Sequence, residues 1–301
     1  MTLKTLKTLK TPVIQAENAA VMAPPRSLTS RPPQPAPPGG IKGLFTRNPL
    51  IAFFALTFAF SWSIVPIGGF LPIGPLIAAL VVLAIIEGRA GLADLGRRML
   101  LWRVGKRWYA FAIVVPLAMV SAVIGISFAL GTPVSVLDSL DPWYLLLALF
   151  LFRLINPMDG PMGEEPGWRG FALPRLQADR SPLVATLILG VIVAAWHLPL
   201  VFLPEEDFSP VFLLASVGIT FMYTWIFNHT GGSVLMTITA HAAQGVIAFA
   251  ALGFIGSEET RAVAIFTAVI VLVAVGLVAY DWRFWRSQAP TECRIETSAI
   301  A

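Results

Sequence analysis

Five ionisable side chains stand out because they lie beside or within long apolar stretches. The segment GEEPGWRG carries two carboxylates and a guanidinium, Glu164, Glu165 and Arg169, and two imidazoles, His197 and His241, fall inside apolar runs further along. A charged group at membrane depth costs at least ~2.5 kcal/mol, so such groups usually face a protein interior or a water-filled cavity. A carboxylate base, imidazoles and hydrogen-bond donors are the groups that activate a water molecule and stabilise an oxyanion. The combination therefore predicts a hydrolytic site.

Each of these residues also has a simpler structural interpretation. Glu165 and Arg169 lie four residues apart, on one face of a helix that would have Pro166 in its first turn, and could form only a structural ion pair. Glu164 could cap a helix end, and either histidine could make a hydrogen bond between helices. His229, in the sequence NHTGG, is interpreted as a loop residue. Only the combination favours chemistry over structure.

The sequence favours an activated water over a covalent intermediate. It has no serine elbow, and its single cysteine, Cys293, lies in a polar C-terminal tail. A divalent metal such as zinc stays open, because Glu164, His197 and His241 could supply three ligands and leave a fourth position for water. The same three groups can also act without a metal.

The composition indicates an integral membrane protein. Of the 301 residues, 56% are hydrophobic and only 13% charged, against ~25% charged in a soluble domain. The net charge of +4 therefore reflects membrane topology and not a nucleic-acid partner. Residues 1–40 are basic and proline-rich and are predicted to be disordered, residues 41–286 form the bundle, and residues 287–301 form the polar tail.

Apolar runs of membrane length predict an all-α polytopic bundle of about eight transmembrane helices. The expected spans are 49–66, 70–86, 109–130, 143–156, 182–203, 209–228, 233–256 and 262–281. With this topology only Arg261, of the 21 Lys and Arg residues, falls on the side opposite the termini. Both termini are therefore expected in the cytoplasm, and the membrane is expected to be the cytoplasmic membrane of a bacterium. An interfacial helix is expected within 88–108.

The depth of the site residues raises a conflict within this topology. Glu164 falls in the cytoplasmic connection 157–181, whereas a rise of ~1.5 Å per residue puts His241 roughly 13 Å and His197 roughly 22 Å below the cytoplasmic face. Either the Glu164 segment dips into the membrane, or the histidine-bearing helices begin later than expected.

At these residues the chain resembles the family of CAAX-processing and bacteriocin-processing (Abi-type) membrane endopeptidases. The similarity runs from about Trp143 to Gly245 and implies a protease-like core within about 143–256. The first family motif, Glu-Glu-x-x-x-Arg, is intact. The second, an aromatic residue followed four positions later by His, has Val193 at the aromatic position and keeps its histidine. The third, His followed four positions later by Asn, ends here on Gly245.

The resemblance implies a role for each motif residue. Glu164 and His197 would activate the water, His241 would stabilise the oxyanion or bind a metal, and Glu165 with Arg169 would orient the site. Gly245 has no side chain to donate, and the nearest substitute, Gln244, lies ~100° round the helix.

These observations predict an intramembrane endopeptidase that acts on a membrane-associated peptide or protein in the lipid bilayer. The departure at Gly245 leaves an alternative, a non-catalytic scaffold or immunity protein of the same fold. A proton-coupled transporter would also use buried Glu, Arg and His, but the sequence shows no convincing internal repeat.

Overall fold

The computed structural model describes residues 39–132, 142–203, 209–247, 254 and 256–287. The predicted disordered and polar tails lie almost entirely outside this part of the chain. The described residues form helices and contain no strand, which confirms the all-α prediction. The helical elements are α2 (Gly40–Arg47), α3 (Pro49–Trp62), η1 (Val65–Ile67), α4 (Gly74–Ile86), α5 (Gly88–Met99), α6 (Lys106–Ala129), α7 (Tyr144–Ile155), α8 (Gly160–Glu165), η3 (Pro166–Ala172), α9 (Leu173–Gln177), α10 (Pro182–Trp196), η4 (Leu198–Phe202), α11 (Phe212–His229), α12 (Val234–Gln244), α13 (Ser257–Tyr280) and α14 (Trp282–Arg286).

The chain is a polytopic helical membrane bundle, but the predicted count of eight spans is not confirmed. Within the described residues, five helical stretches are long and apolar enough to cross a membrane: Pro49–Ile67, Lys106–Ala129, Tyr144–Gln177, Pro182–Phe202 and Ser257–Tyr280. Helix α4 is apolar but shorter. Helix α11 occupies the run expected at 209–228. The run expected at 233–256 contains α12, which is shorter than expected because it ends at Gln244.

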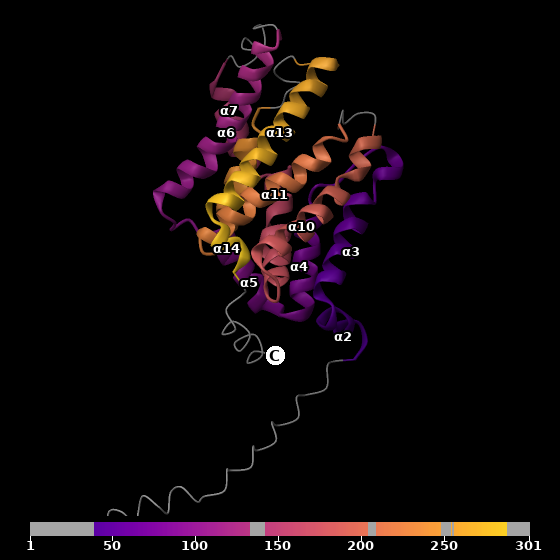
Figure 1. Cartoon of the computed structure of the whole chain (residues 1–301). Coiled ribbons are helices and arrows are strands. Elements are labelled where there is room, and N and C mark those ends of the chain that lie inside the picture. Colours follow the sequence, from indigo (N-terminus) through magenta and orange to yellow (C-terminus); the bar gives the residue numbers. More distant parts are fainter. Residues whose placement is uncertain (1–38, 133–141, 204–208, 248–253, 255, 288–301) are drawn as a thin grey trace, which may run out of the picture. The chain divides into compact units, whose positions relative to one another are not determined.

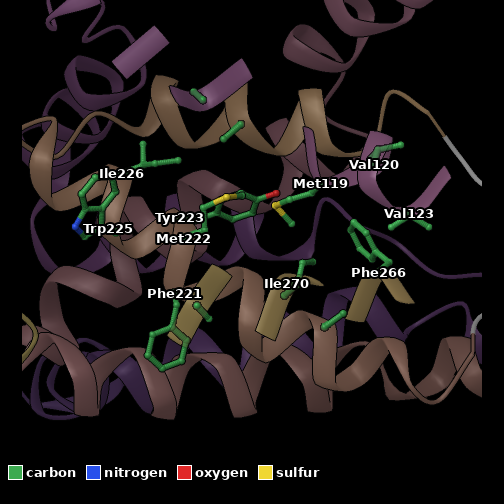
Figure 2. Close-up of a cluster of buried hydrophobic side chains, with 14 of the residues drawn as sticks. Met119, Val120, Val123, Phe221, Met222, Tyr223, Trp225, Ile226, Phe266 and Ile270 are labelled. Carbon is green, nitrogen blue, oxygen red and sulfur yellow. The ribbon is translucent and has the colours of Figure 1, made fainter. Parts of the chain in front are cut away.

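Two apolar clusters hold the bundle together. In Figure 1 α11 lies between α10 and α13, and both of these helices pack against it. One cluster joins α6, α11, α12 and α13 through residues such as Met119, Tyr223 and Phe266 (Figure 2). The other joins α3, α4, η3 and α10 around Phe53, Trp168 and Trp196, whose rings meet edge to face along the series. The polar residues of the site are therefore enclosed by apolar packing on both sides.

The segment that carries the two glutamates is buried, which corrects its expected place in a cytoplasmic connection. It belongs to α8 and η3, which follow α7 after a break at 156–159 within the candidate span Tyr144–Gln177. The exposed fractions of Glu164, Glu165 and Arg169 are 6%, 0% and 2%. The depth conflict is thus resolved by the first alternative: this segment dips into the bundle and meets the histidines there.

The predicted start of this helix at Pro166 is wrong. Helix α8 begins at Gly160 with Pro161 in its first turn, and Pro166 follows in the interior, where η3 is a π-helical segment. Proline has no N–H to donate to the preceding turn, so the regular ladder is interrupted at this point. π-Helical turns are frequent at functional sites, and this one places Arg169 within reach of Glu165.

Close packing of the segment depends on Gly167. A methyl group placed on Gly167 would lie 2.5 Å from the carbonyl oxygen of Pro75 in α4. The absent side chain therefore lets η3 contact α4 directly.

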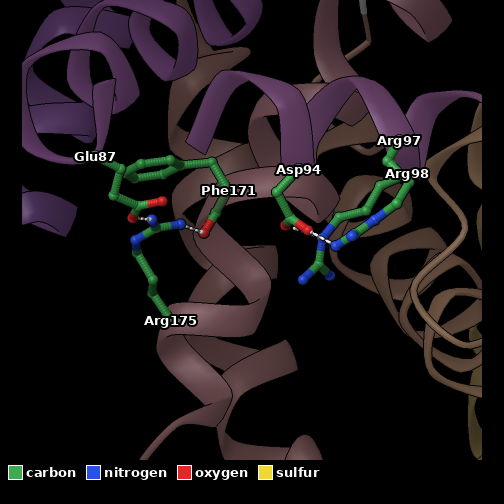
Figure 3. Close-up of polar contacts among 6 residues, drawn as sticks. All are labelled: Glu87, Asp94, Arg97, Arg98, Phe171 and Arg175. Carbon is green, nitrogen blue, oxygen red and sulfur yellow. Dashed lines mark hydrogen bonds and ion pairs between the residues drawn. The ribbon is translucent and has the colours of Figure 1, made fainter. Parts of the chain in front are cut away.

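Polar contacts at one end of the bundle connect α4, α5 and α9 (Figure 3). Arg175 forms an ion pair with Glu87 and donates a hydrogen bond to the carbonyl oxygen of Phe171 at 3.0 Å. In α5, the basic helix expected within 88–108, Asp94 pairs with Arg97 and, at 2.7 Å, with Arg98. Burial alone would raise the pKa of Asp94, but the two guanidinium groups outweigh it and hold that pKa below its usual value.

Candidate active site

The five predicted site residues line one cavity. It has a volume of about 50 Å³ and lies among α8, η3, α10, α11, α12 and α13. Its lining residues are Glu164, Glu165, Arg169, Val193, His197, Phe212, Ala215, Ser216, Ile219, Thr220, Tyr223, His241, Gln244, Phe266 and Ile270. A water molecule needs roughly 10–15 Å³ of such volume, so the cavity can hold a few waters but not a peptide.

Glu165 connects the charged groups of the cavity. Its Oε1 accepts a hydrogen bond from Arg169 Nη1 at 3.1 Å and lies 3.0 Å from His241 Nδ1. Arg169 is also placed over the ring of Tyr223, with its Cζ 5.0 Å from the ring centroid. The predicted pair of Glu165 and Arg169 therefore exists, and it orients His241 as well.

The contact with Glu165 fixes how the imidazole of His241 is used. A carboxylate can only accept, so Nδ1 carries the hydrogen and the lone pair of the neutral ring lies on Nε2. A methyl group placed on Gly160 would lie 3.2 Å from His241 Nε2 and 2.8 Å from Glu164 Oε1. Because Gly160 has no side chain, this space stays open, and the carboxylate of Glu164 and the Nε2 of His241 face it together.

His197 lies where α10 ends. Its Nδ1 is 2.8 Å from the carbonyl oxygen of Val193, which can only accept, so the lone pair of the neutral ring again lies on Nε2. Helix α10 gives way to the 3-10 helix η4 directly after His197, with Pro199 in the first turn of η4. The missing aromatic side chain at Val193 leaves this hydrogen bond intact, since only the backbone takes part.

Two polar residues of the cavity contact each other beside His241. The hydroxyl of Tyr223 donates to Gln244 Oε1 at 3.4 Å, and the Tyr223 ring stacks on His241 with centroids 5.4 Å apart. Gln244, the nearest substitute for the missing motif side chain, therefore faces the cavity, although it is one residue away from the motif position. Sequence reasoning missed Tyr223, and no local signal marks it, because Thr220 and Thr224 also carry hydroxyls on α11.

The three expected metal ligands share the cavity but do not form a ligand set. Within the residues that the structure describes, no three His, Cys, Asp or Glu side chains converge closely enough to hold a metal ion. Glu164, His197 and His241 as they stand therefore do not fit a metal, and the metal remains a prediction for experiment.

Comparison with known proteins gives two matches. Residues 142–247 match the family model of the Rce1-like type II CAAX prenyl endopeptidases. A protein called CAAX prenyl protease 2, from Methanococcus maripaludis, is 27% identical over 132 residues, which cover 39% of this chain and 45% of that protein. The chain therefore spans less than half the length of this relative. The family match, residues 142–247, includes the five predicted site residues.

Proposed function

We propose that this integral membrane protein is an intramembrane endopeptidase, as the match of residues 142–247 to the Rce1-like endopeptidases supports. One observation carries the proposal. Two carboxylates, a guanidinium and two imidazoles from separate segments line one cavity with room for water. The substrate would be a membrane-associated peptide or protein.

In the proposed reaction Glu164 and His197 activate a water molecule. The water oxygen bonds to the scissile carbonyl carbon, Glu164 takes the proton, and the carbonyl electron pair moves to the carbonyl oxygen. When the tetrahedral intermediate collapses, the C–N bond breaks and the proton passes to the departing amine, so that the products are a carboxylate and an amine.

His241 is assigned to the oxyanion side of the site. Its Nε2 faces the same space as Glu164, beside Gly160. A protonated His241 would donate from Nε2 to the developing oxyanion, and the carboxylate of Glu165 would stabilise its positive charge from the Nδ1 side. Arg169, buried beside Glu165, keeps that carboxylate in place.

The cavity must widen before a peptide can bind, because its volume of about 50 Å³ fits only water. Separation of the helices around it would admit the scissile bond and leave lipid and apolar packing around the rest of the site. A lid or helix movement of this kind often limits the rate of such enzymes.

The test is cleavage of a membrane-anchored peptide by purified protein in liposomes. Glu164→Gln and His197→Ala are each expected to lower the rate, whereas His229→Gln, at the far end of α11, should leave it unchanged. Equal rates in wild type and Glu164→Gln would refute the proposal. The same assay with a chelator decides whether a metal takes part, since loss of activity that zinc restores would implicate one.

The alternative of a non-catalytic scaffold or immunity protein is favoured by Gly245 in the third motif. In that case substitutions of His197 and His241 would lower the yield of folded protein, and the folded fraction would keep its biological phenotype. An enzyme gives the opposite pattern, normal folding with a lost phenotype.

The proposed orientation places both termini in the cytoplasm. Cys293 is the single cysteine of the sequence and provides a natural label. A membrane-impermeant maleimide should label it in inside-out vesicles and not in right-side-out vesicles.

A further inference from the structure

Arg153 is a charged residue on a helix that is otherwise apolar. Helix α7 has the sequence YLLLALFLFRLI, and none of its side chains is buried. Large apolar residues of α7, among them Leu147, Leu151 and Phe152, are about half exposed. The side chain of Arg153 is only 17% exposed, so it points inward from a lipid-facing helix.

The contacts of Arg153 lead to the end of α12. Its Nη1 pairs with Asp159 Oδ1 at 3.1 Å. A methyl group placed on Gly245 would lie 2.5 Å from Arg153 Nη2 and 2.9 Å from its Cζ. The guanidinium therefore occupies the space that a side chain at position 245 would fill.

This position adjoins the site on two sides. Gly245 lies one turn after His241, and its N–H donates to the carbonyl oxygen of His241 at 3.2 Å. Asp159, the ionic partner of Arg153, directly precedes Gly160, beside which Glu164 Oε1 and His241 Nε2 face the same space. Helix α7 accordingly packs against both α8 and α12.

The guanidinium keeps donor capacity that the described part of the chain does not use. Among the residues that the structure describes, Arg153 Nε is buried without a hydrogen-bond partner. Arginine carries five N–H donors and stays charged, and an unpaired buried donor costs about 1–3 kcal/mol. The ion pair with Asp159 is made by Nη1 and leaves this Nε donor unused.

We propose that Arg153 is a further catalytic residue, which donates hydrogen bonds from α7 to the scissile carbonyl oxygen. This role rests on the proposed function. As the water oxygen bonds to the carbonyl carbon and Glu164 takes the proton, the negative charge that moves to the carbonyl oxygen is stabilised by the guanidinium. Gly245 is then the residue that makes room for Arg153, and the two positions act as a pair.

The roles of Arg153 and Gly245 can be tested by moving the hydrogen-bond donor from position 153 to position 245. Arg153→Ala should lower kcat about 100-fold with little change in KM, because only a transition-state contact is lost. Gly245→Asn should also lower kcat, since the new side chain displaces the guanidinium. The backbone at Gly245 has φ −97°, so asparagine itself is not strained there.

The double variant Arg153→Ala/Gly245→Asn supplies the decisive comparison. With the guanidinium removed, the asparagine fits and donates, and kcat should rise about tenfold or more above that of Arg153→Ala. Arg153→Lys, which keeps the charge, should retain more activity than Arg153→Gln. The thermal unfolding temperature of each variant is measured in parallel.

Three results separate this inference from the proposed function. If the wild type cleaves, Glu164→Gln does not, and Arg153→Ala or Arg153→Gln cleaves like wild type, the role of Arg153 is overturned and the function stands. The role would also be overturned if the losses in kcat of the two single variants added in the double variant and each loss paralleled a fall in the unfolding temperature. A wild type that cleaves no better than Glu164→Gln would overturn the function and this role together.

Discussion

Two regions of the molecule pair an imidazole with a carboxylate, and they differ in what surrounds the pair. In the cavity, His241 Nδ1 lies 3.0 Å from Glu165. At the end of α11, His229 Nε2 lies 2.9 Å from Asp281 Oδ2, and its Nδ1 lies 2.9 Å from the carbonyl oxygen of Trp225. His229 was expected to be a loop residue, but it ends a helix and fastens it to the chain after α13.

The difference lies in the second ring nitrogen. Both nitrogens of His229 face acceptors of the protein, and rings of Trp108, Trp225 and Phe284 enclose it. His241 instead turns Nε2 towards Gly160 and the carboxylate of Glu164, and the His241–Glu165 pair lines the water-sized cavity. An imidazole–carboxylate pair alone therefore does not mark a site, whereas a pair that lines such a cavity does.

The largest expected effect separates the two histidines by activity. His241→Gln should lower the cleavage rate by about 10²–10³-fold, the usual cost of losing one donor to the oxyanion. His229→Gln should lower only the stability. The activity is measured as peptide cleavage by liposome-embedded protein, and the stability by thermal unfolding in detergent. Equal activity losses in His241→Gln and His229→Gln would contradict the proposed difference between the two histidines.

Removal of the two carboxylates, Glu165 and Asp281, should destabilise the folded protein to different extents. Glu165→Ala leaves Arg169 buried without its partner, and breaking such a pair costs about 3–5 kcal/mol. Asp281 is 25% exposed, so Asp281→Ala should cost about 1–3 kcal/mol, the range for an unsatisfied buried donor. Denaturant unfolding of both variants checks the order, and a larger loss for Asp281→Ala would reverse the comparison.

A methyl group added beside Glu164 and His241 should lower the activity, whereas one added far from the cavity should not. Gly160→Ala places a methyl group between Glu164 and His241, and a displacement of this size should lower kcat/KM about 100-fold. Gly276→Ala on α13, where a methyl group would meet nothing within 4 Å, is the matched control. Unchanged activity in Gly160→Ala would show that the reaction does not use this space.

The smallest effect is expected at the exposed ion pairs of α5. The lowered pKa of Asp94 means that its ionised form stabilises the folded state above the ordinary carboxyl range, and that this stabilisation is lost as the pH falls through the lowered pKa. Asp94→Asn should therefore cost about 1 kcal/mol or less at neutral pH. The difference from wild type should disappear in acid, and a difference that grew in acid would contradict this explanation.

The sequence predicted which residues share the cavity better than it predicted how the helices around them are built. Glu164, His197 and His241 were identified because ionisable groups are rare in apolar segments, and that rule holds wherever the helices lie. The expectation that Pro166 lies in the first turn of the helix was wrong, because Pro161, five residues earlier, fits a first turn equally well. The contact between Arg153 and Gly245 joins residues far apart in the chain, so no local spacing could show it.

The central claim is that Glu164 activates a water molecule in the shared cavity. The most direct measurement is single-turnover cleavage of a membrane-anchored peptide in ¹⁸O-labelled water, by wild type and by Glu164→Gln. We predict one ¹⁸O atom in the new carboxylate of the wild-type product, and no product from Glu164→Gln over the same time. Equal amounts of labelled product from both proteins would contradict the account.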